Sequence, residues 1–296
     1  MKGYTATLPN GEATVYIDRK RWLWLLSVAY PLEPLIGMGL HSVTGNEWWL
    51  LLPFLLNFGF GPVIDWVLGE DRNNPPEEVV IQLDRDRYYR RLTYATVPLH
   101  FLTLIVACWY GATQALSIPG FIGLALVTGM TAGLAINTGH ELGHKNSRLE
   151  KWLAKIVLAV PAYGHFTIDH NLGHHRNVST PGDPASARMG ESIYKFAARE
   201  IPGAFREAWT IEKDRLQRRE RPVWHPNNQI LQSYYVTAML TVALVAAFGW
   251  LMVPFLLLHH VSAYWQLTSA NYIEHYGLLR EQDENGRFER CEPRHS

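Results

Sequence analysis

Residues 121–145 read FIGLALVTGMTAGLAINTGHELGHK and join an apolar run to two histidines. No charged residue occurs in this stretch before Glu141, and a membrane-spanning helix needs roughly 20 apolar residues. His140 and His144 stand four positions apart at the end of the run, so on a helix their imidazoles share one face. The stretch therefore predicts a membrane helix that presents a pair of metal ligands at one end.

Other apolar runs of similar length indicate an integral membrane protein. Hydrophobic residues make up 48% of the 296 residues, and the mean hydropathy is only -0.08 because residues 145–230 are polar. We expect an all-α fold with six transmembrane helices, near residues 22–40, 47–68, 92–115, 119–143, 231–249 and 251–275. Kinks are expected where these spans contain proline, at Pro31, Pro34, Pro53, Pro62 and Pro98.

The basic residues lie on one side of the predicted membrane. The linkers between spans 1 and 2, 3 and 4, and 5 and 6 contain no Lys or Arg, so all 27 basic residues lie in the other segments. The positive-inside rule then places both termini and both long loops in the cytoplasm. The histidine pair at the end of span 4 falls on that same side.

The segment 149–168 is long enough to cross the membrane, but it contains Lys151, Lys155 and Pro161. A crossing here would move the ten basic residues of 176–221 to the outside. We therefore interpret the segment as an interfacial or re-entrant helix. Together with a cytoplasmic cap that carries the histidines, it completes a single membrane-embedded domain over residues 1–296.

Composition excludes several classes of protein. A formal net charge of zero gives no electrostatic footprint for nucleic acid. Two cysteines, Cys108 and Cys291, cannot form a disulfide framework or a cysteine-based metal site. The first 21 residues are too polar for a signal peptide, so the first apolar run is expected to remain as a span.

The histidines gather in three stretches: NTGHELGHK, DHNLGHH and NYIEHYG. Each falls at the cytoplasmic level of the predicted topology, although the topology was derived from Lys and Arg alone. We expect the metal ligands to be His140, His144, His170, His174, His175 and His275. Polar residues beside them are expected to accept or orient the outer imidazole nitrogens, namely Asn137, Glu141, Asp169, Asp183, Asn271 and Glu274.

HELGH also fits H-E-x-x-H, the pattern of zinc proteases. A catalytic zinc takes three protein ligands and one open position, whereas six histidines on one level are too many for one zinc. Two metal ions with nitrogen-rich ligands and open positions, as in non-haem iron centres that activate O2, suit this set better. A histidine-rich membrane metal transporter is a further alternative, but transporters place their ligands near the bilayer midplane.

The motifs NTGHELGHK, DHNLGHHRNVSTPGDPASARMGESIYKF, GEDRNNPPEEVV and LTSANYIEHYGLL resemble the alkane 1-monooxygenase family of the histidine-box membrane hydroxylases and desaturases. The resemblance covers essentially the whole chain and implies two non-haem iron ions held by the six histidines. It implies hydroxylation of medium-chain n-alkanes at the terminal carbon with O2, in the bacterial inner membrane, with the active site on the cytoplasmic side. It also implies electrons from rubredoxin, with rubredoxin reductase upstream. A fatty-acid desaturase or a xylene-type methyl hydroxylase is the nearest alternative.

The family pattern continues past NYIEHYG into a further box of the form H-x-x-H-H, which this chain does not contain before CEPRHS. Two metals with at least four ligands each need about eight donors, and six are present. We therefore expect the remaining ligands to lie on a C-terminal segment beyond this sequence.

An n-alkane has no polar group, so its site should be an apolar tunnel reached from membrane lipid. We expect this substrate tunnel to be lined by Trp49, Phe54, Asn57, Phe58, Phe60 and Leu267. No haem, flavin or iron–sulfur motif is present, so a separate electron donor is needed. The basic segment KDRLQRRERP suggests a docking patch for an acidic donor, made of Arg215, Arg218, Arg219 and Arg221.

Overall fold

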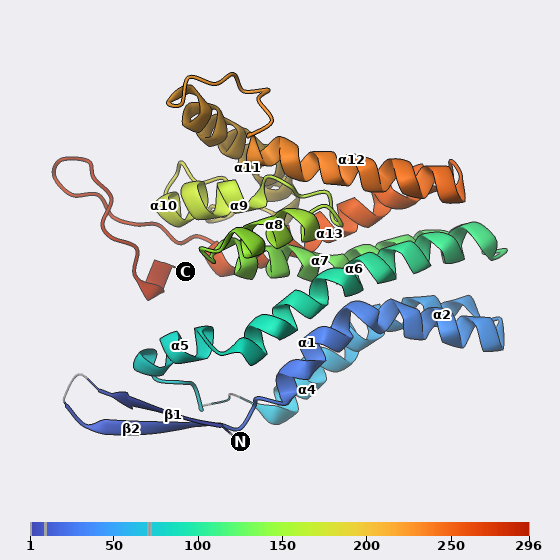
Figure 1. Ribbon diagram of the computed structural model, residues 1–296, viewed down its shortest axis with the longest axis horizontal. Coiled ribbons are helices and arrows are strands. Elements are labelled where there is room, and N and C mark those ends of the chain that lie inside the picture. The colour runs from blue at the N-terminus through green and yellow to red at the C-terminus, as the bar shows by residue number, and fades with distance from the viewer. Residues whose placement is uncertain (1, 9–10, 70, 72, 296) are drawn as a thin grey trace. The chain divides into compact units, whose positions relative to one another are not determined.

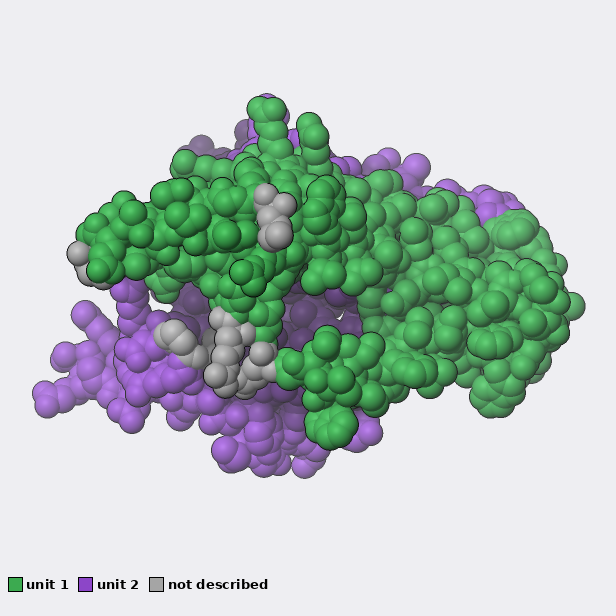
Figure 2. All heavy atoms as spheres, turned by 90° about the horizontal axis from the view of Figure 1, so that it is seen from below, with its two compact units in different colours: residues 1–127 green, residues 128–296 purple. Residues whose placement is uncertain are grey.

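The computed structural model describes residues 2–8, 11–69, 71 and 73–295, and it is mostly helical (Figure 1). The chain divides into two compact units, residues 1–127 (unit 1) and 128–296 (unit 2), which are drawn in two colours in Figure 2. Helix α7 (Ile118–Gly143) begins in unit 1 and ends in unit 2.

Unit 1 opens with an antiparallel hairpin of β1 (Lys2–Thr7) and β2 (Ala13–Asp18). Tyr4 pairs with Tyr16, and both rings pack on Val79 of α5 (Glu77–Asp84). The all-α expectation omitted this hairpin. Its signal was short: two runs of six residues in which aromatic and β-branched side chains are frequent.

Two broken helical segments follow the hairpin. The first comprises η1 (Leu23–Leu25), α1 (Leu26–Ala29), η2 (Tyr30–Leu32) and α2 (Glu33–Thr44), and the second η3 (Glu47–Leu51), α3 (Leu52–Phe54), the π-helical η4 (Leu55–Phe60) and α4 (Gly61–Leu68). Side chains reach the backbone inside these segments: Thr103 donates to the carbonyl of Pro31 at 2.7 Å and Asn57 to that of Pro53 at 2.8 Å. Helix α6 (Arg87–Thr113), in contrast, is continuous through Pro98.

Unit 2 contains the C-terminal part of α7 and the elements that follow it. They are α8 (Arg148–Val157), α9 (Phe166–Ile168), η5 (Asp169–His174), α10 (His175–Asn177), α11 (Ile193–Gln217), α12 (Gln229–Phe248), α13 (Met252–His275) and η6 (Pro293–His295). Arg280 fastens the segment after α13 to α10 and the turn that follows it, because its N–H donates to Ser179 O at 2.8 Å and its guanidinium to Arg176 O at 2.9 Å.

Within the described ranges, five helical segments are long and apolar enough to cross a membrane. They are Leu23–Thr44, Glu47–Leu68, Arg87–Thr113, Ile118–Gly143 and Gln229–Phe248, and they confirm five of the six expected spans as candidates. The sixth expected span corresponds to α13, which has 24 residues but is not among these five. The protein is therefore a multi-pass membrane protein by the length and composition of its helices.

The segment 149–168 does not form one continuous helix. Helix α8 ends at Val157, and the chain then turns, with Ala162 at a φ of 58°, before α9 begins at Phe166. The first turn of α8 is capped by Ser147, whose hydroxyl accepts from Glu150 N and donates to the Glu150 carboxylate at 2.6 Å. Ten helical residues reach about 15 Å, too short to cross a bilayer core of about 30 Å.

Four glycines of α7 let neighbouring segments come close. A Cβ on Gly129 would overlap the backbone carbonyl of His259, and one on Gly133 would lie 2.7 Å from Gln266 Cβ, both on α13. Nearer the C-terminal end of α7, a Cβ on Gly139 would lie 2.7 Å from the Leu158 side chain, and one on Gly143 would lie 2.8 Å from the Thr167 side chain. Small residues four positions apart are a common device for close helix packing in membranes.

Substitution of Gly129 by Ala should lower the free energy of unfolding by about 1–3 kcal/mol, because the methyl group meets rigid backbone rather than a flexible side chain. Gly39 of α2 is the matched control, since a Cβ there meets no atom within 4 Å. The midpoint of thermal unfolding in detergent measures both variants. Equal midpoints for Gly129→Ala and Gly39→Ala would refute the packing argument.

Candidate metal centre

His140 lies in the last turn of α7, and His144 directly follows the helix, with its N–H donating to the carbonyl of His140 at 3.2 Å. The rings of His140 and His144 are 4.7 Å apart, as expected for positions i and i+4 of a helix. The close approach of Gly139 and Gly143 to residues 158 and 167 brings this end of α7 against the chain that leads into η5.

The second histidine group lies on a π-helical turn. In η5 the N–H of His175 donates to the carbonyl of His170, an i→i+5 hydrogen bond. Such a turn places positions i, i+4 and i+5 on one face, so His170, His174 and His175 face the same way. Their rings accordingly lie 5.5 Å (170 to 174) and 4.4 Å (170 to 175) apart. In an α-helix His175 would turn away from His170.

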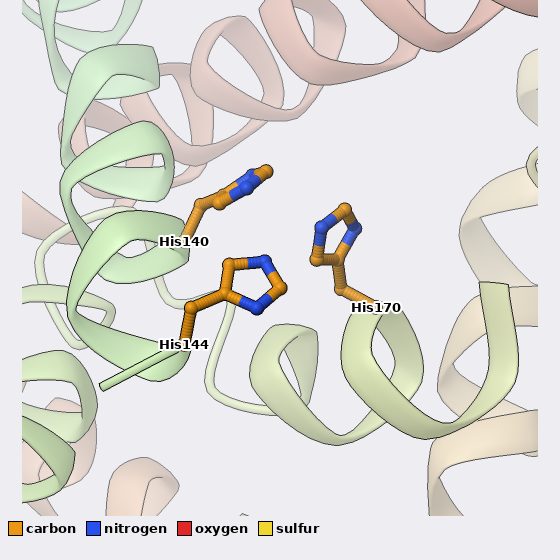
Figure 3. A group of neighbouring side chains, drawn as sticks. All are labelled: His140, His144 and His170. Atoms are coloured by element: carbon orange, nitrogen blue, oxygen red, sulfur yellow. The ribbon is translucent and has the colours of Figure 1, made fainter. Parts of the chain in front are cut away.

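The two groups and His275 form one connected cluster. His170 lies 4.3 Å from His140 and 5.5 Å from His144, ring centroid to centroid, and His144 lies 5.1 Å from His175. Figure 3 shows the imidazoles of His140, His144 and His170 turned toward one another. One ligand atom from each of these three lies within 4.8 Å of the others, close enough to share an ion. The buried His275, at the end of α13, adjoins His174 at 4.9 Å.

The surroundings of the cluster disfavour a proton on His170 and on His175. Burial, followed by the neighbouring histidines, lowers the pKa of His170 to about 2, and the same causes lower the pKa of His175. Neutral imidazoles are the form that binds a metal cation. Two buried ring nitrogens, His170 Nε2 and His275 Nδ1, have no hydrogen-bond partner among the described residues. These residues therefore fit a bound metal.

Asp183 is the clearest carboxylate partner of the cluster. Its Oδ2 lies 3.0 Å from His174 Nδ1 and accepts from Ser186 Oγ at 2.6 Å. Burial alone would raise the pKa of Asp183, but the hydrogen bonds from His174, Ser186 and the Ala185 N–H lower it below its ordinary value. An ionised Asp183 orients His174 and increases the basicity of its other nitrogen.

The remaining predicted partners differ in their positions. Asp169 is buried, and burial together with Glu207 raises its pKa to about 9, so it carries a proton at neutral pH. Glu274 is exposed, with Oε2 4.0 Å from His275 Nε2. Asn137 and Glu141 are exposed on α7, and neither forms a side-chain hydrogen bond with a described residue.

Asn271 donates to Glu200 Oε1 at 3.2 Å, and Thr268 donates to Glu200 Oε2 at 2.8 Å. Sequence reasoning missed this buried carboxylate and also Glu207, which accepts from Asn177 at 2.9 Å and packs against Gly173 in η5. A signal for Glu200 was present. The buried positions of α11 recur every four residues and include two glutamates among apolar side chains: Phe196, Glu200, Ala204, Ala208, Glu212 and Leu216.

The residues predicted to line a substrate tunnel do not all belong to one unit. Trp49, Phe54, Asn57, Phe58 and Phe60 lie in unit 1, and Leu267 lies in unit 2. Phe58 and Phe60 are 62% and 52% exposed, whereas the half-buried Asn57 donates to Glu33 Oε2 at 2.8 Å.

The basic patch lies at the end of α11. Arg215 is half-buried and bound to both carboxylate oxygens of Glu212 at 2.6 Å, so its charge is locally paired. Arg218, Arg219 and Arg221 are exposed.

The sequence is similar to those of known membrane oxidoreductases. A family model described as fatty acid desaturase matches residues 116–296. The alkane 1-monooxygenase 1 of Alcanivorax borkumensis is 55% identical over 281 residues, which cover 95% of this chain and 70% of the relative. The alkane 1-monooxygenases of Pseudomonas putida and Ectopseudomonas oleovorans are 52% and 54% identical, over 97% and 96% of this chain and 73% and 71% of their own lengths.

Substitution of Asp183 by Asn should weaken metal binding about 10- to 100-fold, because the amide cannot stabilise the His174 tautomer as the carboxylate does. Asp214→Asn, on an exposed position of α11, is the matched control. Anaerobic titration with iron(II) against a competing chelator measures the affinity. An affinity equal to that of the unmodified protein would show that Asp183 does not orient His174.

Proposed function

Because the chain belongs to the alkane 1-monooxygenase family, we propose that it hydroxylates medium-chain n-alkanes at the terminal carbon to give 1-alkanols, with O2 as the oxidant. The observation that carries the proposal is the cluster of six neighbouring imidazoles contributed by α7, η5, α10 and α13. Such a set of neutral nitrogens binds redox-active metal, and a monooxygenase needs a metal or organic cofactor to activate O2.

The cofactor proposed for this cluster is a pair of non-haem iron ions. His140, His144, His170, His174, His175 and His275 would hold the iron, which when bound supplies the O2 chemistry. Asp183 orients His174. Asp169 and Glu200 are buried, so the residues packed around them would limit the access of water to the site. Six imidazoles and no thiolate favour this reading over a single catalytic zinc.

The proposed substrate site is an apolar tunnel, because an alkane is recognised by burial of its methylene groups at about 0.8 kcal/mol each. Trp49, Phe54, Asn57, Phe58, Phe60 and Leu267 are the proposed lining. Terminal selectivity would then come from the shape of the tunnel, since the methyl C–H bond is stronger than the methylene C–H bond. The exposed aromatic rings of unit 1 support access from lipid.

The proposed topology has six spans, with α13 as the sixth, and forms a single membrane-embedded domain in the bacterial inner membrane. Both termini, the interfacial helix α8 and the histidine-bearing cap face the cytoplasm in this proposal. The segregation of Lys and Arg supports it.

The proposed electron donor is rubredoxin, reduced in turn by rubredoxin reductase. The exposed Arg218, Arg219 and Arg221 form a positive surface that an acidic donor can approach. Arg215 also belongs to the proposed patch, but its charge is paired with Glu212, so its contribution to docking is expected to be smaller.

A fatty-acid desaturase is the second candidate function, because the family model that matches residues 116–296 carries that description. The two activities differ in substrate and product: one introduces a double bond into an acyl chain, the other a hydroxyl group at an alkane terminus.

The iron-loaded protein, reconstituted in lipid with a reduced donor, should convert octane to 1-octanol, identified by mass spectrometry. Substitution of His140 by Ala should abolish the product and lower the bound iron, because His140 belongs to the three-histidine group. His41→Ala in unit 1 is the control variant. Unsaturated acyl products without 1-octanol would favour the desaturase, and zinc in place of iron would contradict the proposed cofactor.

Charge reversal of Arg218 and Arg219 to Glu should raise the KM for the donor about tenfold at low salt, equivalent to on the order of 1.4 kcal/mol. The difference should shrink as ionic strength rises, because the charges are exposed and screened. Arg206→Glu, on an exposed site of α11 outside the patch, is the control. Kinetics that do not depend on salt in any variant would refute docking at this surface.

A further inference from the structure

A series of aromatic rings in unit 2 begins at the molecular surface. Trp224 is 72% exposed, and its indole lies 5.5 Å from that of Trp209, centroid to centroid. Trp209 stacks on Phe205 at 6.1 Å. Phe205 then lies 5.3 Å from His165 and 6.2 Å from Tyr234, and the last two residues share a hydrogen bond of 2.9 Å.

The series continues inward to the histidine cluster. His165 lies 4.3 Å from the fully buried Tyr163, which lies 6.1 Å from Phe166. Phe166 stacks on His170 at 5.0 Å and lies 6.3 Å from His140. We name the rings from Trp224 to Phe166 the ring chain. No step along it exceeds 6.3 Å between centroids, so it links the surface to two of the metal-binding histidines without a break.

Packing alone does not account for the outer end of the ring chain. An indole that is 72% exposed gains little from burial, and it lies beside a second tryptophan rather than in the core. The described part of unit 2 also places other tryptophans at its surface, such as Trp152, whose ring contacts the Lys155 ammonium and lies outside the ring chain.

The chemistry proposed for the metal centre suggests a role for the ring chain in electron transfer. Hydroxylation of a methyl group requires an oxidant that can remove hydrogen from a strong C–H bond. Tryptophan and tyrosine rings are oxidised more readily than that bond. Inward from Trp209 and Tyr234, the next readily oxidised ring is that of Tyr163. One ring, that of Phe166, separates Tyr163 from His170.

We propose that the ring chain conducts oxidising equivalents from the metal centre out to Trp224 when O2 has been activated but no alkane is bound. This inference rests on the proposed function, because it requires the oxidant that hydroxylation uses. Its role would be protection of the histidines and of the buried rings from oxidation.

Reduction of O2 to two waters takes four electrons and four protons. In hydroxylation the donor supplies two electrons, and the C–H bond that becomes C–OH supplies the other two. Without alkane, these last two electrons come from Trp224, one at a time along the ring chain. Solvent supplies the protons that complete the second water. Each time, the exposed indole loses its N–H proton to water. A soluble thiol restores the electron and the proton, and two thiols form one disulfide.

The test measures where the protein is oxidised. The iron-loaded protein in lipid consumes O2 with reduced donor, without alkane and without thiol. Peptide mass spectrometry then gives the oxidation of each tryptophan per O2 consumed. Normalisation to O2 removes any effect of a variant on donor binding. Freeze-quenched samples are examined for a tryptophan radical by electron paramagnetic resonance. The variant Trp209→Phe keeps a ring in place but interrupts the readily oxidised positions.

We expect Trp224 to carry most of the oxidation in the unmodified protein, and the Trp224 signal to fall several-fold in Trp209→Phe. The exposed Trp152 is the internal control and should stay low in both. Equal oxidation of Trp224 and Trp152, or an unchanged Trp224 signal in Trp209→Phe, would indicate a diffusible oxidant and overturn the proposal. A parallel incubation with octane separates the two hypotheses. If 1-octanol forms in the incubation with octane but Trp224 stays unoxidised in the incubation without octane, only the ring chain is refuted. Absence of 1-octanol refutes the proposed function, on which the ring chain rests.

Discussion

The close contact between α7 and its neighbours in unit 2 is the constraint on which the histidine cluster depends. Two glycine pairs on α7 remove the side chains that would keep α13 and residues 158–167 at a distance. The first pair fixes α7 against α13, the helix that ends in His275. The second pair brings the end of α7 that carries His140 and His144 to the level of η5. Without both contacts, three stretches separated by up to 135 positions in sequence would not share one site.

Burial of the histidine cluster costs free energy in the protein alone, and a bound cation would offset that cost. Buried imidazole nitrogens such as His170 Nε2 and His275 Nδ1 lack protein partners, and an unsatisfied buried polar group costs about 1–3 kcal/mol. Burial also disfavours a proton on His170, as its lowered pKa shows. A metal ion satisfies the lone pairs without bringing like charges together. Binding of the proposed metal would therefore be thermodynamically coupled to the packing of unit 2.

Much of this arrangement could be predicted from the sequence, and the rest depended on local geometry. The i, i+4 spacing of His140 and His144 was sufficient because α7 is an ordinary helix there. His175 reaches the same face as His170 only through the π-helical turn, and spacing alone gives no sign of that turn. Glu200 and Glu207 were missed because carboxylates on a polar helix suggest solvent. Asn137 and Glu141, one helical position away from buried neighbours, turned out to be exposed.

The location of the cluster at helix ends follows from what the proposed reaction must bring together. An alkane partitions into hydrocarbon, whereas electrons and protons arrive from water. A site at the bilayer midplane would be accessible to the alkane but distant from a soluble donor, and a site in a soluble domain would have the opposite limitation. The ends of α7 and α13, joined by the polar segment from α8 to α11, meet both requirements. That position also leaves reactive chemistry only a few aromatic rings from solvent, so the route taken by surplus oxidising equivalents becomes a structural property of unit 2.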